Sequence, residues 1–210
     1  MTKSTWAVVI VVILMLAIGG AIAYRGPLLR LVAPAPKAPP VATTTPDTTA
    51  AWQSYATSTY SFKYPQSYAF NTAYAYDQFG PAKLIVGVSI TIPAAMATGT
   101  NLSADTRLSI EQLPRAKKCT GDIFILANVA AQNITAEGTD YSLATTSGAA
   151  AGNLYEEHVY ALATSTPCTA VRYLVHSANI ANYEPGAVRE FDRAALLGEF
   201  DKIRRSVRMK

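Results

Sequence analysis

Three hydrophobic patterns divide the chain. A continuous apolar run of 19 residues, Trp6–Tyr24, comes first and carries no charge. Further along, short runs alternate apolar and polar residues, as strands with one buried face do. Near the carboxyl terminus, apolar residues recur at helical spacing, which predicts an amphipathic helix. This order predicts a membrane segment followed by a domain of strands and one terminal helix.

The apolar run has the length of a membrane span. A helix of this length extends roughly 28 Å, close to the ~30 Å hydrocarbon core of a bilayer. Trp6 and Tyr24 lie at its ends, where aromatic rings favour the headgroup level. We therefore expect residues 1–24 to be an N-terminal transmembrane anchor, with residues 6–24 in the lipid bilayer. A cleaved signal peptide is the alternative, because Ala21-Ile22-Ala23 matches a cleavage pattern.

The segment after the run separates it from the domain. Residues 25–50 are rich in Pro, Ala and Thr and show no apolar period in their second half. Proline favours extended polyproline II structure, so the composition predicts a semi-rigid stalk. The remaining residues, 51–210, are long enough for one domain with its own hydrophobic core.

Strand patterns are dense within this domain. Each run alternates apolar and polar residues or is rich in β-branched residues, and most runs end at a strand-breaking residue such as proline. The runs are Thr59–Pro65, Lys83–Ile92, Arg107–Leu113, Leu154–Leu162 and Cys168–Ser177. The last two runs predict a β-hairpin, because only five residues connect them. By contrast, residues 66–82 predict irregular chain, residues 122–131 a short helix and residues 146–152 a turn.

The carboxyl terminus predicts a helix. Asp192 is a helix-capping residue, and the apolar stripe behind it consists of Leu196, Leu197, Phe200 and Ile203. The whole pattern predicts an α+β domain with five to seven strands, mostly antiparallel. The C-terminal helix packs on one face of this sheet, and a single N-terminal transmembrane helix precedes it.

Charge excludes one class of partner. The net charge is +4, and four of the basic residues precede the domain. From Ala51 onward there are 14 basic and 13 acidic residues, so the domain is close to neutral. A nucleic-acid-binding surface needs a basic patch, and we therefore expect no nucleic-acid partner.

The cysteines and the flanking charges bear on the compartment. Two cysteines, Cys119 and Cys168, predict one disulfide in an exported domain; two buried free thiols are the alternative in the cytoplasm. The basic residues Arg25, Arg30 and Lys37 favour the domain inside, against Lys3 and the amino terminus on the other side. The stalk and the cysteine pair favour it outside. We expect a single-pass protein of the plasma (inner) membrane with an extracytoplasmic domain.

Candidate chemistry is sparse. The chain has two histidines and no motif for zinc, phosphate or dinucleotide binding, so we predict no catalytic residue, metal or cofactor. Glu156 and His158 share one face of the first hairpin strand, and Arg172 and His176 share one face of the second. An even register places His158 near Arg172 and forms a ligand-binding cluster of the four, whereas an odd register weakens it. A solvated sheet face with a cross-strand ion pair is the alternative to a binding site. The polar loop with Asn179, Asn182, Tyr183 and Glu184 is a second candidate.

Two motifs resemble the PsbP-like family, named for a subunit of the oxygen-evolving complex. The matching residues are Tyr60, Phe62, Pro65, Phe200, Ile203, Ser206 and Val207. The anchor and the ending also resemble those of membrane-anchored bacterial exported proteins. The PsbP-like resemblance implies an antiparallel sheet sandwiched by helices, and it implies neither catalytic residues nor a photosystem role.

Three functional hypotheses remain. The first is a non-enzymatic, membrane-tethered domain that binds or scaffolds an unknown cell-envelope protein or polymer. The second is an envelope hydrolase that uses His158 or His176, with a serine or aspartate in hydrogen-bond reach of the imidazole. The third is a small-ligand sensor, which requires an enclosed apolar pocket.

Overall fold

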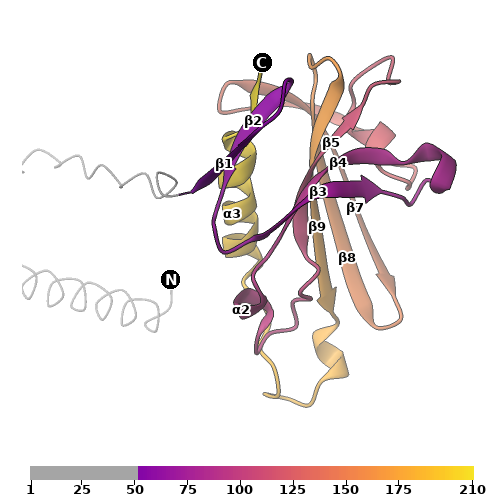
Figure 1. The fold of residues 1–210 in the computed structure, drawn as a ribbon. Coiled ribbons are helices and arrows are strands. Elements are labelled where there is room, and N and C mark those ends of the chain that lie inside the picture. The colour runs from indigo at the N-terminus through magenta and orange to yellow at the C-terminus, as the bar shows by residue number, and fades with distance from the viewer. Residues whose placement is uncertain (1–51) are drawn as a thin grey trace, which may run out of the picture. The chain divides into compact units, whose positions relative to one another are not determined.

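A seven-stranded antiparallel sheet is the centre of the domain (Figure 1). The computed structural model describes residues 52–210, so the expected anchor and stalk lie outside the described residues. The strand order is β3-β4-β5-β9-β8-β7-β6. The strands are β3 (Ala69–Tyr76), β4 (Ile85–Thr91), β5 (Arg107–Leu113), β6 (Gln132–Ala136), β7 (Thr139–Ala150), β8 (Asn153–Leu162) and β9 (Cys168–Ala178).

Short helical turns lie in the connections. They are η1 (Pro81–Lys83), α2 (Ala94–Ala97), η2 (Gly121–Phe124) and η3 (Ile180–Asn182). In residues 52–210 no helix combines the length and the apolar character that a membrane crossing requires.

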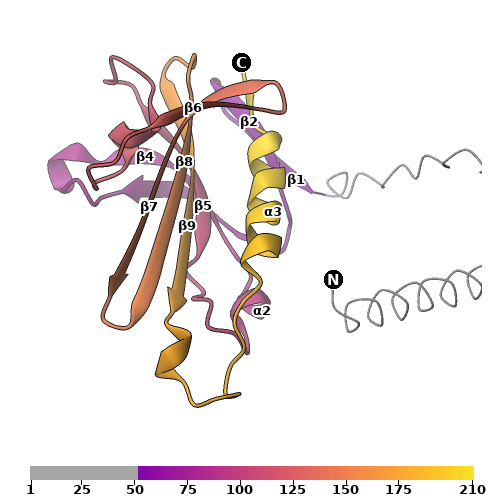
Figure 2. The ribbon, with the colours of Figure 1, turned by 180° about the vertical axis from the view of Figure 1, so that it is seen from behind.

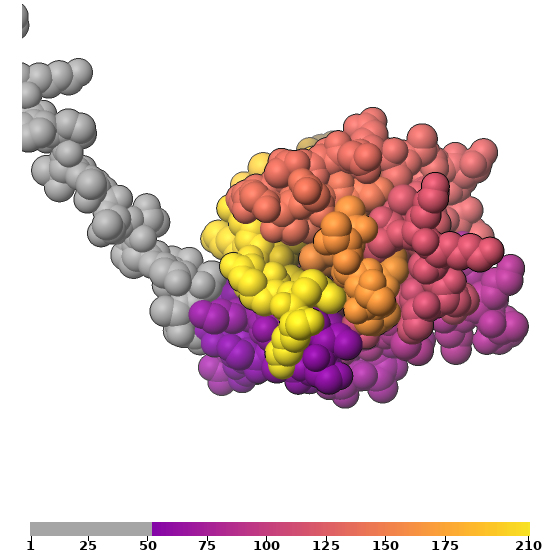
Figure 3. Space-filling view, turned by 90° about the horizontal axis from the view of Figure 1, so that it is seen from above, coloured from indigo at the N-terminus to yellow at the C-terminus, as the bar shows by residue number. Residues whose placement is uncertain are grey.

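A second sheet of three strands joins the two ends of the domain. Its order is β1 (Gln53–Ala56), β2 (Tyr60–Tyr64) and β10 (Arg208–Met209), and both pairings are antiparallel. The backbone N–H of Lys63 donates to Ser206 Oγ at 2.9 Å, and the Ser206 hydroxyl lies 3.1 Å from the Lys63 carbonyl. Figure 3 shows the yellow carboxyl-terminal segment against the indigo first strands. The segments that contain Lys63 and Ser206, distant in sequence, are therefore neighbours in space.

The helix α3 (Arg193–Arg205) covers one face of the large sheet, as Figures 1 and 2 show. The Asp192 side chain caps it by accepting a hydrogen bond from the Ala195 N–H at 2.9 Å, as expected. Buried residues of the helix and of β9 belong to the same core: Leu196, Phe200 and Ile203 with Val171, Tyr173 and Val175. The predicted α+β fold, with a mostly antiparallel sheet and a C-terminal helix on one face, is confirmed.

A long connection covers part of the opposite face of the sheet. Residues 114–131 link β5 to β6 and carry η2. A Cβ atom on Gly121 would lie only 2.7 Å from the Ala144 nitrogen, so only glycine fits this close approach. The disulfide between Cys119 and Cys168, predicted from the sequence, joins the connection to β9. Phe124 and Ile125 pack into a second buried cluster on this face.

Three local predictions were wrong. The expected turn at residues 146–152 is mostly strand, because β7 continues to Ala150 along β8 and only Ala151 and Gly152 turn. Residues 66–82 contain the strand β3, which pairs along β4. The helix expected at residues 122–131 is one short turn, η2, packed on the sheet. In each case pairing or packing against a distant segment decided the conformation, and local composition does not report such contacts.

Candidate functional site

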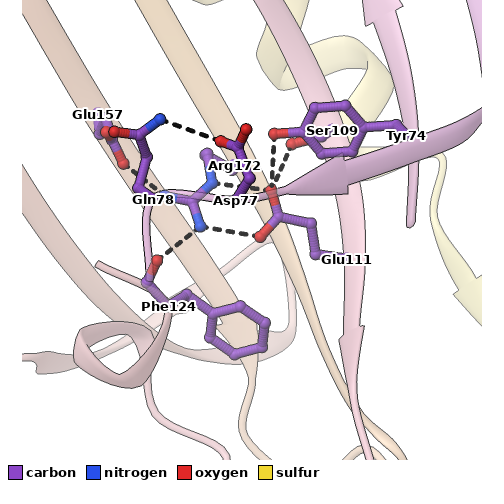
Figure 4. A network of polar contacts seen from close by, with 8 residues as sticks. All are labelled: Tyr74, Asp77, Gln78, Ser109, Glu111, Phe124, Glu157 and Arg172. Carbon is purple, nitrogen blue, oxygen red and sulfur yellow. Dashed lines mark hydrogen bonds and ion pairs between the residues drawn. The ribbon is translucent and has the colours of Figure 1, made fainter. Parts of the chain in front are cut away.

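Arg172, in the middle of β9, is the centre of a buried polar network (Figure 4). Its Nε and Nη2 atoms each donate to a carboxylate oxygen of Glu111 at 2.8 Å. Nη2 also donates to the Phe124 carbonyl at 2.6 Å, and Nη1 bonds to Glu157. The side chains of Arg172 and Glu111 are 1% and 0% exposed. Such a pair is tolerated in a core when its polar atoms find partners, and here each side-chain nitrogen of Arg172 and each carboxylate oxygen of Glu111 has at least one.

Neighbouring residues complete the network. The Ser109 hydroxyl donates to Glu111 Oε1 at 2.7 Å, and the Arg172 guanidinium lies over the Tyr76 ring at 3.7 Å. Burial lowers the pKa of Arg172, but the charge and hydrogen bonds of Glu111, with Glu157 and Tyr76, together outweigh burial and raise that pKa above its ordinary value. Burial raises the pKa of Tyr76 to about 12. The guanidinium therefore stays charged and the phenol stays neutral at physiological pH.

A groove lies above this network, on the sheet face opposite α3. Its volume is about 660 Å³. Tyrosines, carboxylates and the apolar end of the 114–131 connection line it: Tyr74, Ala75, Tyr76, Asp77, Gln78, Asp105, Arg107, Ile125, Leu126, Ala127, Thr146, Tyr155, Glu157 and Leu174. The network of Arg172 therefore holds together three walls of the groove, because Glu157, Tyr76 and the Phe124 carbonyl belong to different segments.

The groove has an excess of negative charge. Three carboxylates line it, from Asp77, Asp105 and Glu157, against the single guanidinium of Arg107. The Arg107 guanidinium lies 5.6 Å from the centre of the Tyr74 ring. The network beneath the groove does not cancel this excess, because Arg172 has two carboxylate partners, Glu111 and Glu157. Four carboxylates therefore stand against two guanidiniums, and the groove favours a cationic group.

His176 stands at the edge of this groove. Its Nδ1 lies 2.7 Å from Asp105 Oδ1, and its ring stacks on Tyr155 with the two centres 4.5 Å apart. The Nε2 atom is buried and has no hydrogen-bond partner among the described residues. Among the hydrogen bonds of residues 52–210, none joins either histidine ring to a serine, threonine or cysteine side chain.

Glu156 and His158 lie on the other face of β8, toward α3. Nε2 of His158 bonds to Glu156, and Arg193, the first residue of α3, donates its Nε to Glu156 Oε2 at 2.8 Å. Hydrogen bonds from Arg193 lower the pKa of Glu156 to about 2; burial opposes this shift and the contact with His158 supports it. This cluster joins the beginning of α3 to the sheet.

The register separates the four residues predicted as one cluster. His158 lies opposite Tyr173, and Val159 lies opposite Arg172, so the register is the odd one. Arg172 and His176 consequently face the groove side, whereas Glu156 and His158 face α3. The expected proximity of His158 to Arg172 was wrong, since the two side chains point to opposite faces of the sheet.

Several residues of the groove were missed in the sequence. The sequence held a signal for two of them, Glu111 and Glu157, because a buried arginine at the centre of a strand requires carboxylate partners on adjacent strands. The alternation in Arg107–Leu113 correctly placed Arg107, Ser109 and Glu111 on one face. The tyrosines of β3 could not be assigned to the groove from the sequence, because residues 66–82 were expected to be irregular and no strand face was predicted for them.

The polar loop after β9 has structural contacts. Asn182 Nδ2 donates to the Gly152 carbonyl at 2.7 Å, and Asn179 Oδ1 accepts from the Ala181 N–H at 3.0 Å. These bonds hold η3 against the turn between β7 and β8. Within residues 52–210, no group of three or more His, Cys, Asp or Glu side chains is arranged to hold a metal ion.

Comparison with known proteins shows a distant structural likeness. No family model matches the chain, and no curated protein matches it. A crystal structure of a protein from Bacteroides thetaiotaomicron VPI-5482 is similar over 72% of this chain, with 10% identity and a TM-score of 0.40. The chain spans 45% of the length of that protein. The resemblance to the PsbP-like family stays a prediction.

Proposed function

We propose that residues 51–210 are a binding domain held on the outer side of the plasma (inner) membrane by the anchor at residues 1–24. In this proposal the groove holds a cationic group of a cell-envelope protein or polymer. The observation that supports it most is the carboxylate excess of a tyrosine-lined groove whose floor is a fully satisfied ion-pair network.

Rigidity supports binding at this site. The groove walls are tied to the Arg172 network, and the disulfide fixes the connection that carries Leu126. Tyr155 is 37% exposed and Leu126 is 61% exposed, so part of an aromatic ring and an apolar side chain are open to a ligand in the groove. A groove of this size accommodates a side chain or a small ligand, and pre-arranged walls reduce the entropy lost on binding.

Charge sets the ligand class. The carboxylates attract an amine or a guanidinium, and tyrosine rings bind cations through their faces. Apolar contact with Leu126 suits the hydrocarbon part of such a group. A lysine or arginine side chain on an envelope protein, or an amine on a polymer, fits both surfaces.

A titration with defined peptides tests this function. We expect the full chain to bind tetralysine and not tetraglutamate, with affinity falling as salt rises. Asp77→Asn should weaken binding, because Asp77 lines the groove. Glu184→Gln is the matched control, since it removes one exposed carboxylate outside the groove. Equal binding of both peptides, or equal effects of both variants, would contradict the proposal.

A reporter enzyme fused after Lys210 tests the location. We expect activity only for a reporter that works outside the cytoplasm. Activity of a cytoplasmic reporter would reverse the proposed orientation, and the groove would then serve a cytoplasmic partner.

A hydrolase that uses His176 is the second candidate. The hydrogen bond from His176 Nδ1 to the Asp105 carboxylate favours it, because an aspartate that accepts at this position orients a catalytic imidazole. The geometry supports it less than binding, since Nε2 is buried away from solvent and no hydroxyl or thiol side chain of the described residues bonds to the ring. Unchanged hydrolysis of generic ester substrates in His176→Gln would remove this candidate.

A further inference from the structure

The outer half of β7 is a free edge of the large sheet. On this side β6 pairs with β7 only from Thr139 to Leu143, while β7 continues to Ala150. Figures 1 and 2 both show this part of β7 at the outside of the sheet with no strand beside it. Its exposed backbone is therefore available to another strand.

This edge lacks the usual protection against strand addition. Natural edge strands carry charges, prolines or bulges that prevent pairing with another chain. The segment Thr145–Ala150 contains only Thr, Ser, Gly and Ala, and its pairing with β8 is regular throughout. All of its residues except Thr146 are exposed. The segment has the properties of a pairing surface.

The tight turn identifies which backbone groups face outward. Ala150 and Asn153 close a two-residue hairpin at Ala151 and Gly152, which both have positive φ. In such a hairpin the closing pair exchanges its hydrogen bonds, and alternate residues then face the other side. Thr145, Ser147 and Ala149 consequently direct their N–H and carbonyl groups to the free edge.

Large apolar side chains lie exposed beside this edge. Leu154 is 41% exposed and Tyr155 is 37% exposed, and they point to opposite faces of β8. Their partners on β7 are Ala149 and Gly148, which are too small to cover them. A strand added along β7 would bring side chains over both.

We propose that β7 pairs with β7 of a second copy of this chain, antiparallel and with the two-fold axis at Ser147. This register pairs Thr145 with Ala149 of the second copy on either side of the axis. Three hydrogen-bonded pairs give about six backbone bonds. The two large sheets then continue into one another.

The charge pattern favours a second copy as the occupant. A two-fold axis brings identical residues together, so any charge near the axis faces its own copy and is repelled. From Tyr141 to Tyr155 the hairpin has no charged side chain, so this pairing encounters no repulsion along its length. A different partner would not require a neutral edge.

The oligomeric state of the full chain in mild detergent tests the proposal. By light scattering after size exclusion we expect a dimer for the wild type. Ser147→Lys places two like charges on the axis and should raise the dimer dissociation constant by at least about tenfold. Ser147→Pro should do the same, because it removes an outward N–H without removing a bond to β8. Gln66→Lys, an exposed turn position, is the matched control and should leave the dimer unchanged.

Two results would overturn the proposal. One is a wild-type chain that stays monomeric at tens of micromolar, a concentration at which modest interfaces already associate. The other is a dimer that persists in both Ser147 variants while their circular dichroism matches the wild type. Protection of the Thr145, Ser147 and Ala149 amides from hydrogen exchange, present only in the dimer, would support the register.

Discussion

Arg172 and Glu111 form a two-bond ion pair across β9 and β5, with both bonds at 2.8 Å and both side chains excluded from solvent. Removing Glu111 leaves the buried Arg172 guanidinium with Glu157 as its one remaining carboxylate partner. We expect Glu111→Ala to destabilise the domain by about 3–5 kcal/mol, measured by urea unfolding. The double variant Glu111→Leu with Arg172→Met should be markedly more stable than Glu111→Ala, because it removes the fully buried guanidinium that Glu111→Ala leaves in the core. If Glu111→Ala lowers the free energy of unfolding no more than the double variant does, the buried Arg172 does not depend on Glu111 as its partner.

The disulfide should stabilise the domain and the groove together. Cys119 and Cys168 are 49 positions apart in the sequence, so their disulfide closes a long loop, and such a link contributes about 2–4 kcal/mol. We expect Cys119→Ala with Cys168→Ala to lower stability by that amount and to weaken tetralysine binding, since the connection that carries Leu126 loses its attachment. Mass analysis before and after reduction of the wild type checks the link. Two free thiols in the exported chain would refute it.

Phe200 should be a major contact of α3 with the sheet. It is fully buried against Tyr173, with the ring centres 5.3 Å apart, whereas Leu197 is only half-buried. We expect Phe200→Ala to cost about 3–5 kcal/mol in urea unfolding and Leu197→Ala clearly less. Similar losses of unfolding free energy in the two variants would show that the face of α3 packed on the sheet also includes Leu197.

Glu156 should make stability sensitive to acid. Its pKa is about 2 in the folded chain against an ordinary value of 4.5, mainly because Arg193 donates to it. A lowered folded pKa stabilises the chain above the ordinary value, and that contribution is lost as pH falls from about 4.5 to about 2. We expect the difference in melting temperature between the wild type and Glu156→Gln to shrink over this interval. Glu184→Gln, at an exposed carboxylate, should show no such convergence.

The sequence alone predicted much of the fold. Strands with a continuous apolar or alternating pattern, such as Arg107–Leu113 and the β8–β9 hairpin, and the capped helix behind Asp192 carry their signal within a few residues. Weakly patterned strands such as β3 were missed, because their pairing partner, not their composition, holds them extended.

The same distinction applies to the functional site. The sequence determined that Glu156 and His158 share one side of their strand and that Arg172 and His176 share one side of theirs, because side chains alternate strictly along a strand. Only the tertiary structure decided that these two sides face opposite directions. A shift of one residue in pairing exchanges the faces, and the register depends on contacts over the whole sheet. The groove likewise exists only because β3, β5, β8 and the disulfide-linked connection meet around Arg172.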